Sequence, residues 1–403
     1  MVELIKLICT RRMIAVLLLG LSSGVPLLLI GSTLQAWLKD SGFSLETIGL
    51  FAAVGIPYSL KFLWAPFLDR YGLKIFDRRR GWIFVFQLIL AGLFVGLAYT
   101  NPEKSAFSFS LIAVLISFFS ASQDVVIDAY RREILSDKEL PLGVSLAVSG
   151  YRVGMLLSGA FALYIADSVG WTNVYNIMAC LMLSLTVITV FAPKVETPQS
   201  VSEMNLVQSV LMPIMEFIKR KGAFYILIFI MLYKIGDQLA SNMFMPFFME
   251  MGFIKQDIAS ISKLYGLCAT ILGGILGGWI LLKIKLRTGL IGFGLLQMIS
   301  TACFCFLVYC PTKLMLGCVV VFENLSGGMG TSAYAAFMAL LCNKKFTATQ
   351  YALLSSLMIL PTKIFGSATG YLVSYMGWTN FYIFCALIAI PGILMLFVKK
   401  WWQ

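Results

Sequence analysis

Residues 13–36 read MIAVLLLGLSSGVPLLLIGSTLQA, a run without a single charge near the start of the chain. A helix needs about 20 apolar residues to cross the hydrocarbon core of a bilayer, so this run predicts a membrane-spanning helix. It is longer than the ~7–15 apolar residues of a signal-peptide core, and no small-residue cleavage site follows it. We therefore expect the helix to be retained.

The same pattern recurs to the end of the chain. Of the 403 residues, 60% are hydrophobic and only 12% are charged, against about 25% charged in an ordinary soluble domain. The fold class predicted is an all-α polytopic membrane protein with twelve transmembrane helices. The helices are expected at 13–36, 46–68, 82–99, 108–130, 141–166, 171–192, 223–249, 257–282, 288–309, 312–341, 347–374 and 378–398.

The net charge of +12 has a topological explanation, because the basic residues lie in short loops between apolar runs and form no surface for nucleic acid. The two termini and the loops after each even-numbered helix hold 22 Lys and Arg residues, whereas the opposite loops hold only Lys39, Lys104, Lys255, Lys263 and Lys313. By the positive-inside rule, both termini face the cytoplasm of a multi-pass protein in a bacterial inner membrane.

An internal repeat divides the chain into two parts. GWTNVY at 170–175 opens the sixth predicted helix and GWTNFY at 377–382 opens the twelfth, 207 residues later. The longest polar segment lies between the two copies. We predict an N-terminal six-helix bundle at 1–192, a cytoplasmic linker at 193–222 and a C-terminal six-helix bundle at 223–403. This arrangement resembles the major facilitator superfamily, in which solute binds between two six-helix halves.

The loop after the second helix supports this resemblance. It reads APFLDRYGLKIFDRRRGW at 65–82 and is similar to the signature G-x-L-x-D-R-x-G-R-R of that superfamily. Ala65 replaces the usual Gly, and Leu73-Lys74 replaces the basic pair. The resemblance implies that the Asp braces one half against the other in the outward-open state. A conformational switch is then expected at Asp69, Arg70, Gly72 and Arg131, with Arg131 or Arg132 as partner of the Asp. The alternative is that these are ordinary positive-inside charges.

A longer stretch resembles one family within the superfamily. VFENLSGGMGTSAYAAFMALLCNKKFTATQYALLSS at 321–356 closely resembles the AmpG muropeptide permeases, and further similarity covers most of the chain. The resemblance implies a proton-linked importer of anhydro-muropeptides from wall turnover that works by alternating access. It also implies no enzymatic activity and no cofactor. The alternative substrate is another bulky anionic solute, such as an acyl-coenzyme A or a nucleotide-like metabolite. Many relatives carry two further C-terminal helices.

Carboxylates inside the predicted helices are the candidate proton carriers, because the chain has no histidine. Asp124 and Asp128 lie four residues apart on one face of the fourth helix, where two carboxylates can share a proton. Glu323 is the second candidate, in the tenth helix. The alternative for Asp128 is a structural pair with Arg131 or Arg132.

Substrate binding is expected at cationic, amide and aromatic side chains inside the helices. Arg152 is the predicted clamp for a substrate carboxylate, with a permanent structural ion pair as its alternative. Lys234 and Asp237, three residues apart, are expected to neutralise each other. The further candidates for substrate binding are Gln35, Gln123, Tyr151, Lys363 and Asn324.

Other classes of function find little support in the sequence. The nine Cys residues include no CxxC pair, so no metal site is predicted. A membrane enzyme would need a nucleophile, a base or a phosphate-binding loop, and none of their motifs is present. A non-transporting sensor with the same fold is the remaining alternative. The expected partners are the muropeptide, protons and membrane lipids, and the protein is expected to be a monomer.

Overall fold

The structure is a computed structural model of the chain. It describes residues 6–398 apart from 45–46, 49–50, 74 and 196–205, and within that range it leaves the side chains of 52, 206–210, 255–256, 259, 263–264, 362–363 and 367 undescribed. The described elements are all helical. The helices of the first part are α2 (Arg11–Leu29), α3 (Ser32–Asp40), α5 (Ile56–Leu60), α6 (Ala65–Arg70), α7 (Arg78–Ala98), α8 (Ala106–Ile134), α9 (Leu140–Leu156), α10 (Ala162–Val169), α11 (Trp171–Phe191) and α12 (Leu206–Ile218).

The second part continues in the same way. Its helices are α13 (Ala223–Leu232), α14 (Ile235–Asn242), α15 (Phe244–Glu250), α16 (Lys255–Ile258), α17 (Gly266–Leu281), α18 (Leu286–Ala302), α19 (Cys305–Tyr309), α20 (Lys313–Leu341), α21 (Thr347–Phe365), α22 (Thr369–Leu387) and α23 (Ile390–Met395). Short 3₁₀ turns lie at Phe51–Gly55, Lys61–Leu63 and Gly366–Ala368, and π-helical turns lie at Leu157–Phe161 and Ala259–Tyr265.

Ten segments of the described chain are long and apolar enough to cross a membrane. Nine of them match a predicted helix to within about four residues at each end, and the tenth, Thr369–Met395, begins nine residues before the predicted twelfth helix at 378–398. The other two predicted helices are interrupted. Residues 51–70 form short helices separated by 3₁₀ turns, with Pro57 and Pro66 each near the start of a new helix, as expected for a residue that cannot donate the backbone hydrogen bond. Residues 347–376 run through α21, a 3₁₀ turn and the first part of α22.

The two copies of the GWTN repeat adopt the same backbone conformation. Gly170 has φ 76° and ψ 158°, and Gly377 has φ 76° and ψ 167°. A side chain is strained at such a positive φ, so glycine is the residue that permits this corner between two helices. At Gly377 the corner lies inside α22, which is thus two helices that meet at a kink. These two helices correspond to the eleventh and twelfth predicted spans.

By its internal contacts the described chain forms two compact units. Unit 1 comprises 1–136, 146–213 and 342–352, and unit 2 comprises 137–145, 214–341 and 353–403. The predicted boundaries at 192 and 223 remain a prediction. Much of the predicted linker, at 196–205, lies outside the described residues, and Leu206–Ile218 of that linker is helical.

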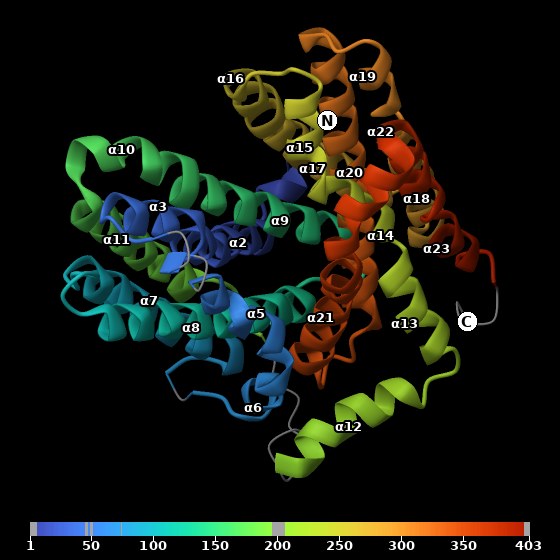
Figure 1. Cartoon of the computed structure of the whole chain (residues 1–403). Coiled ribbons are helices and arrows are strands. Elements are labelled where there is room, and N and C mark those ends of the chain that lie inside the picture. The colour runs from blue at the N-terminus through green and yellow to red at the C-terminus, as the bar shows by residue number, and fades with distance from the viewer. Residues whose placement is uncertain (1–5, 45–46, 49–50, 74, 196–205, 399–403) are drawn as a thin grey trace. The chain divides into compact units, whose positions relative to one another are not determined.

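In unit 1 the helix α7 packs between α8 and α11, and α2 contacts the same two helices (Figure 1). Glycine allows α2 and α9 to approach at backbone distance. A Cβ on Gly24 would lie 2.0 Å from the carbonyl oxygen of Tyr151, and a Cβ on Gly150 would lie 2.0 Å from that of Leu17. Small residues at helix contacts are the usual means of close packing in membranes.

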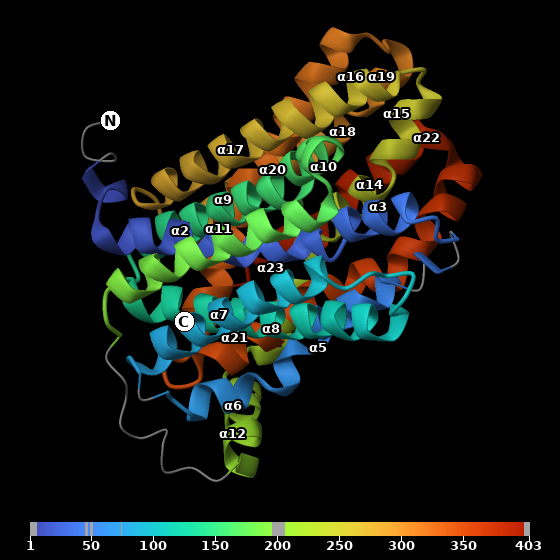
Figure 2. The same cartoon turned by 90° about the vertical axis from the view of Figure 1, so that its left-hand side faces the viewer.

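In unit 2 the closest helix pair is α17 with α20, which lie side by side (Figure 2). Their glycines make this contact. A Cβ on Gly273 would lie 2.1 Å from the carbonyl oxygen of Leu325, and a Cβ on Gly328 would lie 2.3 Å from that of Thr270. The SGGMG stretch therefore serves as a close-packing surface, and it brings the polar face of α20 near its neighbours.

Candidate functional site: buried charge in the helices

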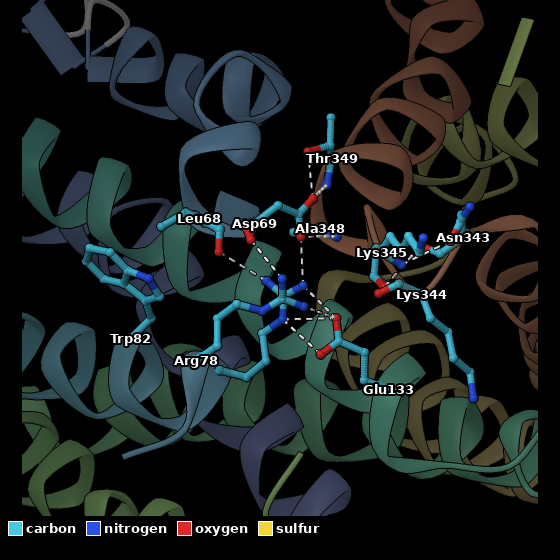
Figure 3. A network of polar contacts seen from close by, with 12 residues as sticks. Leu68, Asp69, Arg78, Trp82, Glu133, Asn343, Lys344, Lys345, Ala348 and Thr349 are labelled. Atoms are coloured by element: carbon cyan, nitrogen blue, oxygen red, sulfur yellow. Dashed lines mark hydrogen bonds and ion pairs between the residues drawn. The ribbon is translucent and has the colours of Figure 1, made fainter. Parts of the chain in front are cut away.

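Asp69 is the centre of a buried polar network in unit 1. It is 2% exposed, and its carboxylate accepts hydrogen bonds from Arg79 Nη2 at 2.7 Å and from the Thr349 hydroxyl at 2.7 Å. It also accepts from the backbone N–H groups of Ala348 (3.2 Å) and Thr349 (2.8 Å) (Figure 3). These two amides lie in the first turn of α21, where helix N–H groups have no partner within the helix. Asp69 thus caps a helix 280 residues away in sequence.

Arg79 and Glu133 complete this network. Arg79 is fully buried, and its Nη2 lies 2.5 Å from Glu133 Oε1, while its Nη1 donates to the Leu68 carbonyl at 3.2 Å. Arg78 contacts Glu133 at 3.2 Å and donates to the backbone carbonyl of Asp69 at 2.8 Å (Figure 3). Every charge in the group therefore has an opposite charge and further hydrogen bonds, which is the condition for burying ions without a large penalty.

The other predicted switch residues lie around this network. Gly72 packs against the start of α7, since a Cβ there would lie 3.3 Å from Arg78 Cα. The guanidinium of Arg70 lies 5.0 Å from the ring centroid of Tyr71. Within the described residues Asp69 contacts Arg79 and neither Arg131 nor Arg132, so the sequence-based choice of partner is corrected. Arg78, Arg79 and Arg80 follow the motif, and the packing of α7 brings the middle one, Arg79, into contact with Asp69.

Asp128 forms an ion pair with Arg131, which the sequence analysis gave as the alternative to proton sharing. Its carboxylate lies 2.8 Å from Arg131 Nη2, one turn along α8. The guanidinium of Arg131 also lies 5.4 Å from the ring centroid of Tyr351, at the part of α21 that belongs to unit 1. Asp128, one of the two carboxylates predicted to share a proton, therefore has the cation Arg131 as its partner.

Asp124 lies deeper in unit 1, on the buried face of α8. It is 8% exposed and accepts a short hydrogen bond from the Ser23 hydroxyl of α2. Asp124 forms no ion pair among the described residues. The nearby Tyr58 hydroxyl donates to Ser120 at 2.7 Å. A buried carboxyl that has a hydroxyl donor but no bound cation can exist with or without a proton.

Gln123, predicted to bind substrate, is part of a buried amide network. It is fully buried and donates to the Ser22 hydroxyl at 3.0 Å, and Gln87 donates to the same oxygen at 2.9 Å. Thr189 of α11 donates to Gln87 at 2.7 Å. The network joins α2, α7, α8 and α11, and within the described structure the amide oxygen of Gln123 has no hydrogen-bond partner, so its role in substrate binding stays a prediction.

The remaining predicted substrate residues of the first half are more accessible. Gln35 in α3 and both Tyr151 and Arg152 in α9 are partly exposed. The backbone of Tyr151 lies near that of Asp124's partner Ser23: a Cβ on Gly24, the next residue, would lie 2.0 Å from the Tyr151 carbonyl oxygen. Lys363 lies in α21, and its side chain is outside the part of the chain that the structure describes.

Glu323 has a different environment, in unit 2. It is 3% exposed and accepts hydrogen bonds from the Ser300 hydroxyl at 2.5 Å and the Thr301 hydroxyl at 3.2 Å. Its neighbour Asn324 accepts from Thr270 at 2.9 Å and donates to the Val320 carbonyl at 2.9 Å, which ties the predicted substrate amide into the contact of α17 with α20.

Lys234 and Asp237 pair as predicted, at 3.1 Å, and the pair extends to further groups. The Lys234 ammonium is 7% exposed and also donates to Gln297 Oε1 at 2.8 Å. A Cβ on Gly330 would lie 2.8 Å from that same oxygen, so the SGGMG glycines make room for this group. Lys234, Asp237 and Gln297 therefore form one polar cluster in unit 2.

Several residues of these sites were missed by the sequence analysis. Arg79 appears there only within the quoted loop, Glu133 was not singled out, and Thr349 has no charge to attract notice. A signal was present for one of them: Asp77 begins α7 with an N-cap, accepting from the backbone of Arg79 and Arg80, and this cap fixes where the three arginines start their helix. Ser23 and Thr349 could not be identified from spacing, because their partners come from distant helices.

Comparison with known proteins places the chain in a family. The model of the Major Facilitator Superfamily matches residues 12–361. The anhydromuropeptide permease of Escherichia coli (strain K12) is 40% identical over 392 residues, which cover 96% of this chain and 80% of that protein. A putative transporter, AmpG 4, of Rickettsia conorii is 33% identical over 401 residues and covers 97% of both chains.

Solved structures agree on the fold. The outward conformation of the transporter FucP has a TM-score of 0.69 at 12% identity and covers 95% of this chain and 97% of its own. The proton:xylose symporter XylE has a TM-score of 0.67 at 12% identity, with coverages of 97% and 95%. The predicted all-helical fold is confirmed, and the chain belongs to the Major Facilitator Superfamily as a membrane transporter related to the AmpG permeases.

Proposed function

We propose that this transporter imports anhydro-muropeptides across a bacterial inner membrane, with both termini in the cytoplasm. The observation that carries the proposal is the 40% identity, along 96% of the chain, to the anhydromuropeptide permease of Escherichia coli. The excess of Lys and Arg at the termini and even-numbered loops supports the orientation. The protein acts as a monomer in this proposal.

Uptake is driven by protons in this proposal, with Asp124 as the first carrier. Its carboxyl is buried and hydrogen-bonded to Ser23, and it has no ion pair among the described residues. A proton on Asp124 removes a buried charge, so binding and release of that proton change the electrostatics of α8. Asp128 holds Arg131 in place and does not itself carry the transported proton.

Arg152 and Tyr151, half-exposed on α9, are proposed to bind an acidic part of the muropeptide, and Gln35 to bind an amide of it. A guanidinium holds a carboxylate by two parallel hydrogen bonds, which suits a substrate with peptide carboxyl groups. Asp69 with its network serves as the conformational switch, because its bonds to the first turn of α21 must break if that helix end moves.

The test is uptake of a radiolabelled anhydro-muropeptide into proteoliposomes that contain the purified protein, with and without an imposed proton gradient. We expect accumulation that an uncoupler abolishes. Asp124→Asn should abolish gradient-driven accumulation, and Asp257→Asn, at an ion pair with Lys313, is the control that should leave it intact. No accumulation by folded wild-type protein would reject the muropeptide as substrate, and equal accumulation by Asp124→Asn would reject Asp124 as carrier.

A further inference from the structure

The helix α12 exposes apolar side chains along one face. Four of them are 45–61% exposed: Leu211, Met212, Met215 and Ile218. Met215 lies four residues after Leu211 and three after Met212, and Ile218 follows three residues later, which is the spacing of one helix face. The opposite face packs against the protein, where Phe217 is 2% exposed and Pro213 is buried. We call the four exposed residues the apolar stripe of α12.

The length of α12 excludes a membrane span as the reason for this exposure. The helix has 13 residues, whereas about 20 are needed to cross the hydrocarbon core of a bilayer. A short apolar helix of this size is either buried in a protein core or lies in the membrane interface. The exposure of the stripe rules out the core. The interface is then the environment in which these side chains leave water.

A tight turn joins α12 to the span that follows it. The span begins at Ala223, five residues after the end of α12 at Ile218. Gly222 has φ 84° and ψ 8°, a left-handed conformation that glycine adopts without strain. The Ala223 N–H donates to the Arg220 carbonyl at 3.1 Å and closes the turn. The stripe is therefore held close to the end of α13 at which the span begins (Figure 1).

A second span ends beside this turn. Arg220 donates from Nη1 to the carbonyl of Leu341, the last residue of α20. The same guanidinium pairs with Glu216 at 2.7 Å and so fastens the turn to α12. Tyr225, in the first turn of α13, is 43% exposed, as expected of an aromatic anchor at the membrane interface. One span starts and another ends at this turn, which indicates that α12 lies at the level of a membrane surface.

Two lysines give the end of α12 a positive charge. Lys219 and Lys221 are exposed, and Arg220 between them is balanced by Glu216. An apolar face bordered by exposed lysines is the pattern of helices that bind anionic membrane surfaces. A soluble partner protein would have to compete with a lipid surface that the turn already brings to the stripe. The charge and the position therefore favour lipid as the occupant.

We propose that α12 lies in the membrane surface, with its apolar stripe among the acyl chains and with Lys219 and Lys221 bound to anionic phospholipid headgroups. This lipid site is separate from the buried charges described above. It anchors the chain just before α13 to the bilayer, so that any movement of this end of α13 includes a lipid-bound helix. The proposal goes beyond transport and requires neither the muropeptide nor a proton.

Photolabelling of the full-length protein in proteoliposomes tests the position of the stripe. A diazirine that partitions into the bilayer forms a carbene that labels side chains in contact with acyl chains. We expect peptide mass spectrometry to find label on the stripe, with Phe224 of α13, 69% exposed, as internal reference. Met215→Glu should reduce the label on α12 and leave that on α13. Label on α13 with none on the stripe of the wild-type protein would overturn the proposal.

Hydrogen exchange of the full-length protein in nanodiscs tests the lysines. Each lysine near an anionic surface adds about fivefold to membrane affinity, and two add about 25-fold. We therefore expect the backbone amides of 211–218 to exchange up to about 25-fold more slowly in phosphatidylglycerol than in phosphatidylcholine. The double variant Lys219→Gln, Lys221→Gln should lose this lipid dependence.

The double variant Lys283→Gln, Lys285→Gln is the matched control and should keep the lipid dependence, because it removes two exposed lysines at the same spacing from the loop after α17. Equal exchange of α12 in the two lipids would overturn the proposal, and so would a lipid dependence that survives without Lys219 and Lys221. Neither measurement uses a substrate. A folded protein that takes up no muropeptide would reject the proposed substrate and leave these results unchanged.

Discussion

Asp69 and Glu323 are equally buried, at 2% and 3% exposure, and they are compensated in opposite ways. Asp69 has an arginine, two helix N–H groups and a hydroxyl, all of which favour a permanent negative charge. Glu323 has two hydroxyl donors and no ion pair among the described residues, and a buried carboxyl without a cation favours the neutral acid. Burial alone therefore does not identify a proton carrier. The chemistry of the partners separates a fixed charge from an exchangeable one.

The largest effect is expected from Arg79→Met, because it leaves both Asp69 and Glu133 buried with much less positive charge. Removal of one partner of a buried ion pair costs about 3–5 kcal/mol. We expect a loss of this size in the free energy of unfolding, measured by chemical unfolding in mixed micelles. Arg220→Met is the matched control: its pair with Glu216 is partly exposed and should cost no more than about 1 kcal/mol. Equal losses of unfolding free energy in the two variants would contradict the distinction between the buried and the partly exposed ion pair.

Asp69→Asn comes next and tests the fixed charge directly. The amide keeps the size of the side chain but places an N–H₂ group where Asp69 receives only donors, and it leaves Arg79 with Glu133 as its one carboxylate. We expect a loss of about 3 kcal/mol in the same unfolding measurement, from one lost charge-assisted bond and one donor facing donors. A variant as stable as wild type would mean that Asp69 is neutral in the folded protein.

The two threonines that contact these carboxyls sharpen the comparison. Thr349→Val removes a 2.7 Å bond to an ionised Asp69 and should cost about 1.5 kcal/mol. Thr301→Val removes a longer contact, at 3.2 Å, to a Glu323 that keeps Ser300, and should cost about 0.5 kcal/mol. Unfolding of both variants in parallel checks the order. A larger loss for Thr301→Val would indicate that Glu323 is the ionised member of the comparison.

How far the sequence predicts these sites depends on how local they are. Apolar runs located the spans, and the repeated GWTN marked the start of two predicted helices, where both glycines adopt the same positive φ. Asp69 and Glu323 stood out as charges within or beside apolar helices. Their partners did not, since Thr349 meets Asp69 across 280 residues and the choice of Arg79 over Arg131 depends on where α7 packs.

Gln123 and Asn324 show the converse limit. Both are amides inside apolar helices and were predicted to bind substrate, yet in the structure Gln123 bonds to Ser22, and Asn324 bonds to Thr270. Amide groups serve helix packing and ligand binding by the same hydrogen bonds. Residue type and depth in the membrane therefore cannot separate the two uses, whereas the identity of the neighbours can.

The smallest effect on stability is expected from Glu323→Gln, although it removes a buried acid. The amide oxygen can accept from Ser300 and Thr301 as Glu323 does. We expect a change of less than about 1 kcal/mol in the free energy of unfolding, since a neutral group replaces a neutral acid with the same bonds. A loss as large as that of Asp69→Asn would show that Glu323 is charged in the folded protein. Both substitutions keep the size of the side chain. A comparison of the unfolding free energies of Asp69→Asn and Glu323→Gln therefore reports whether each carboxyl is charged or neutral, independently of transport.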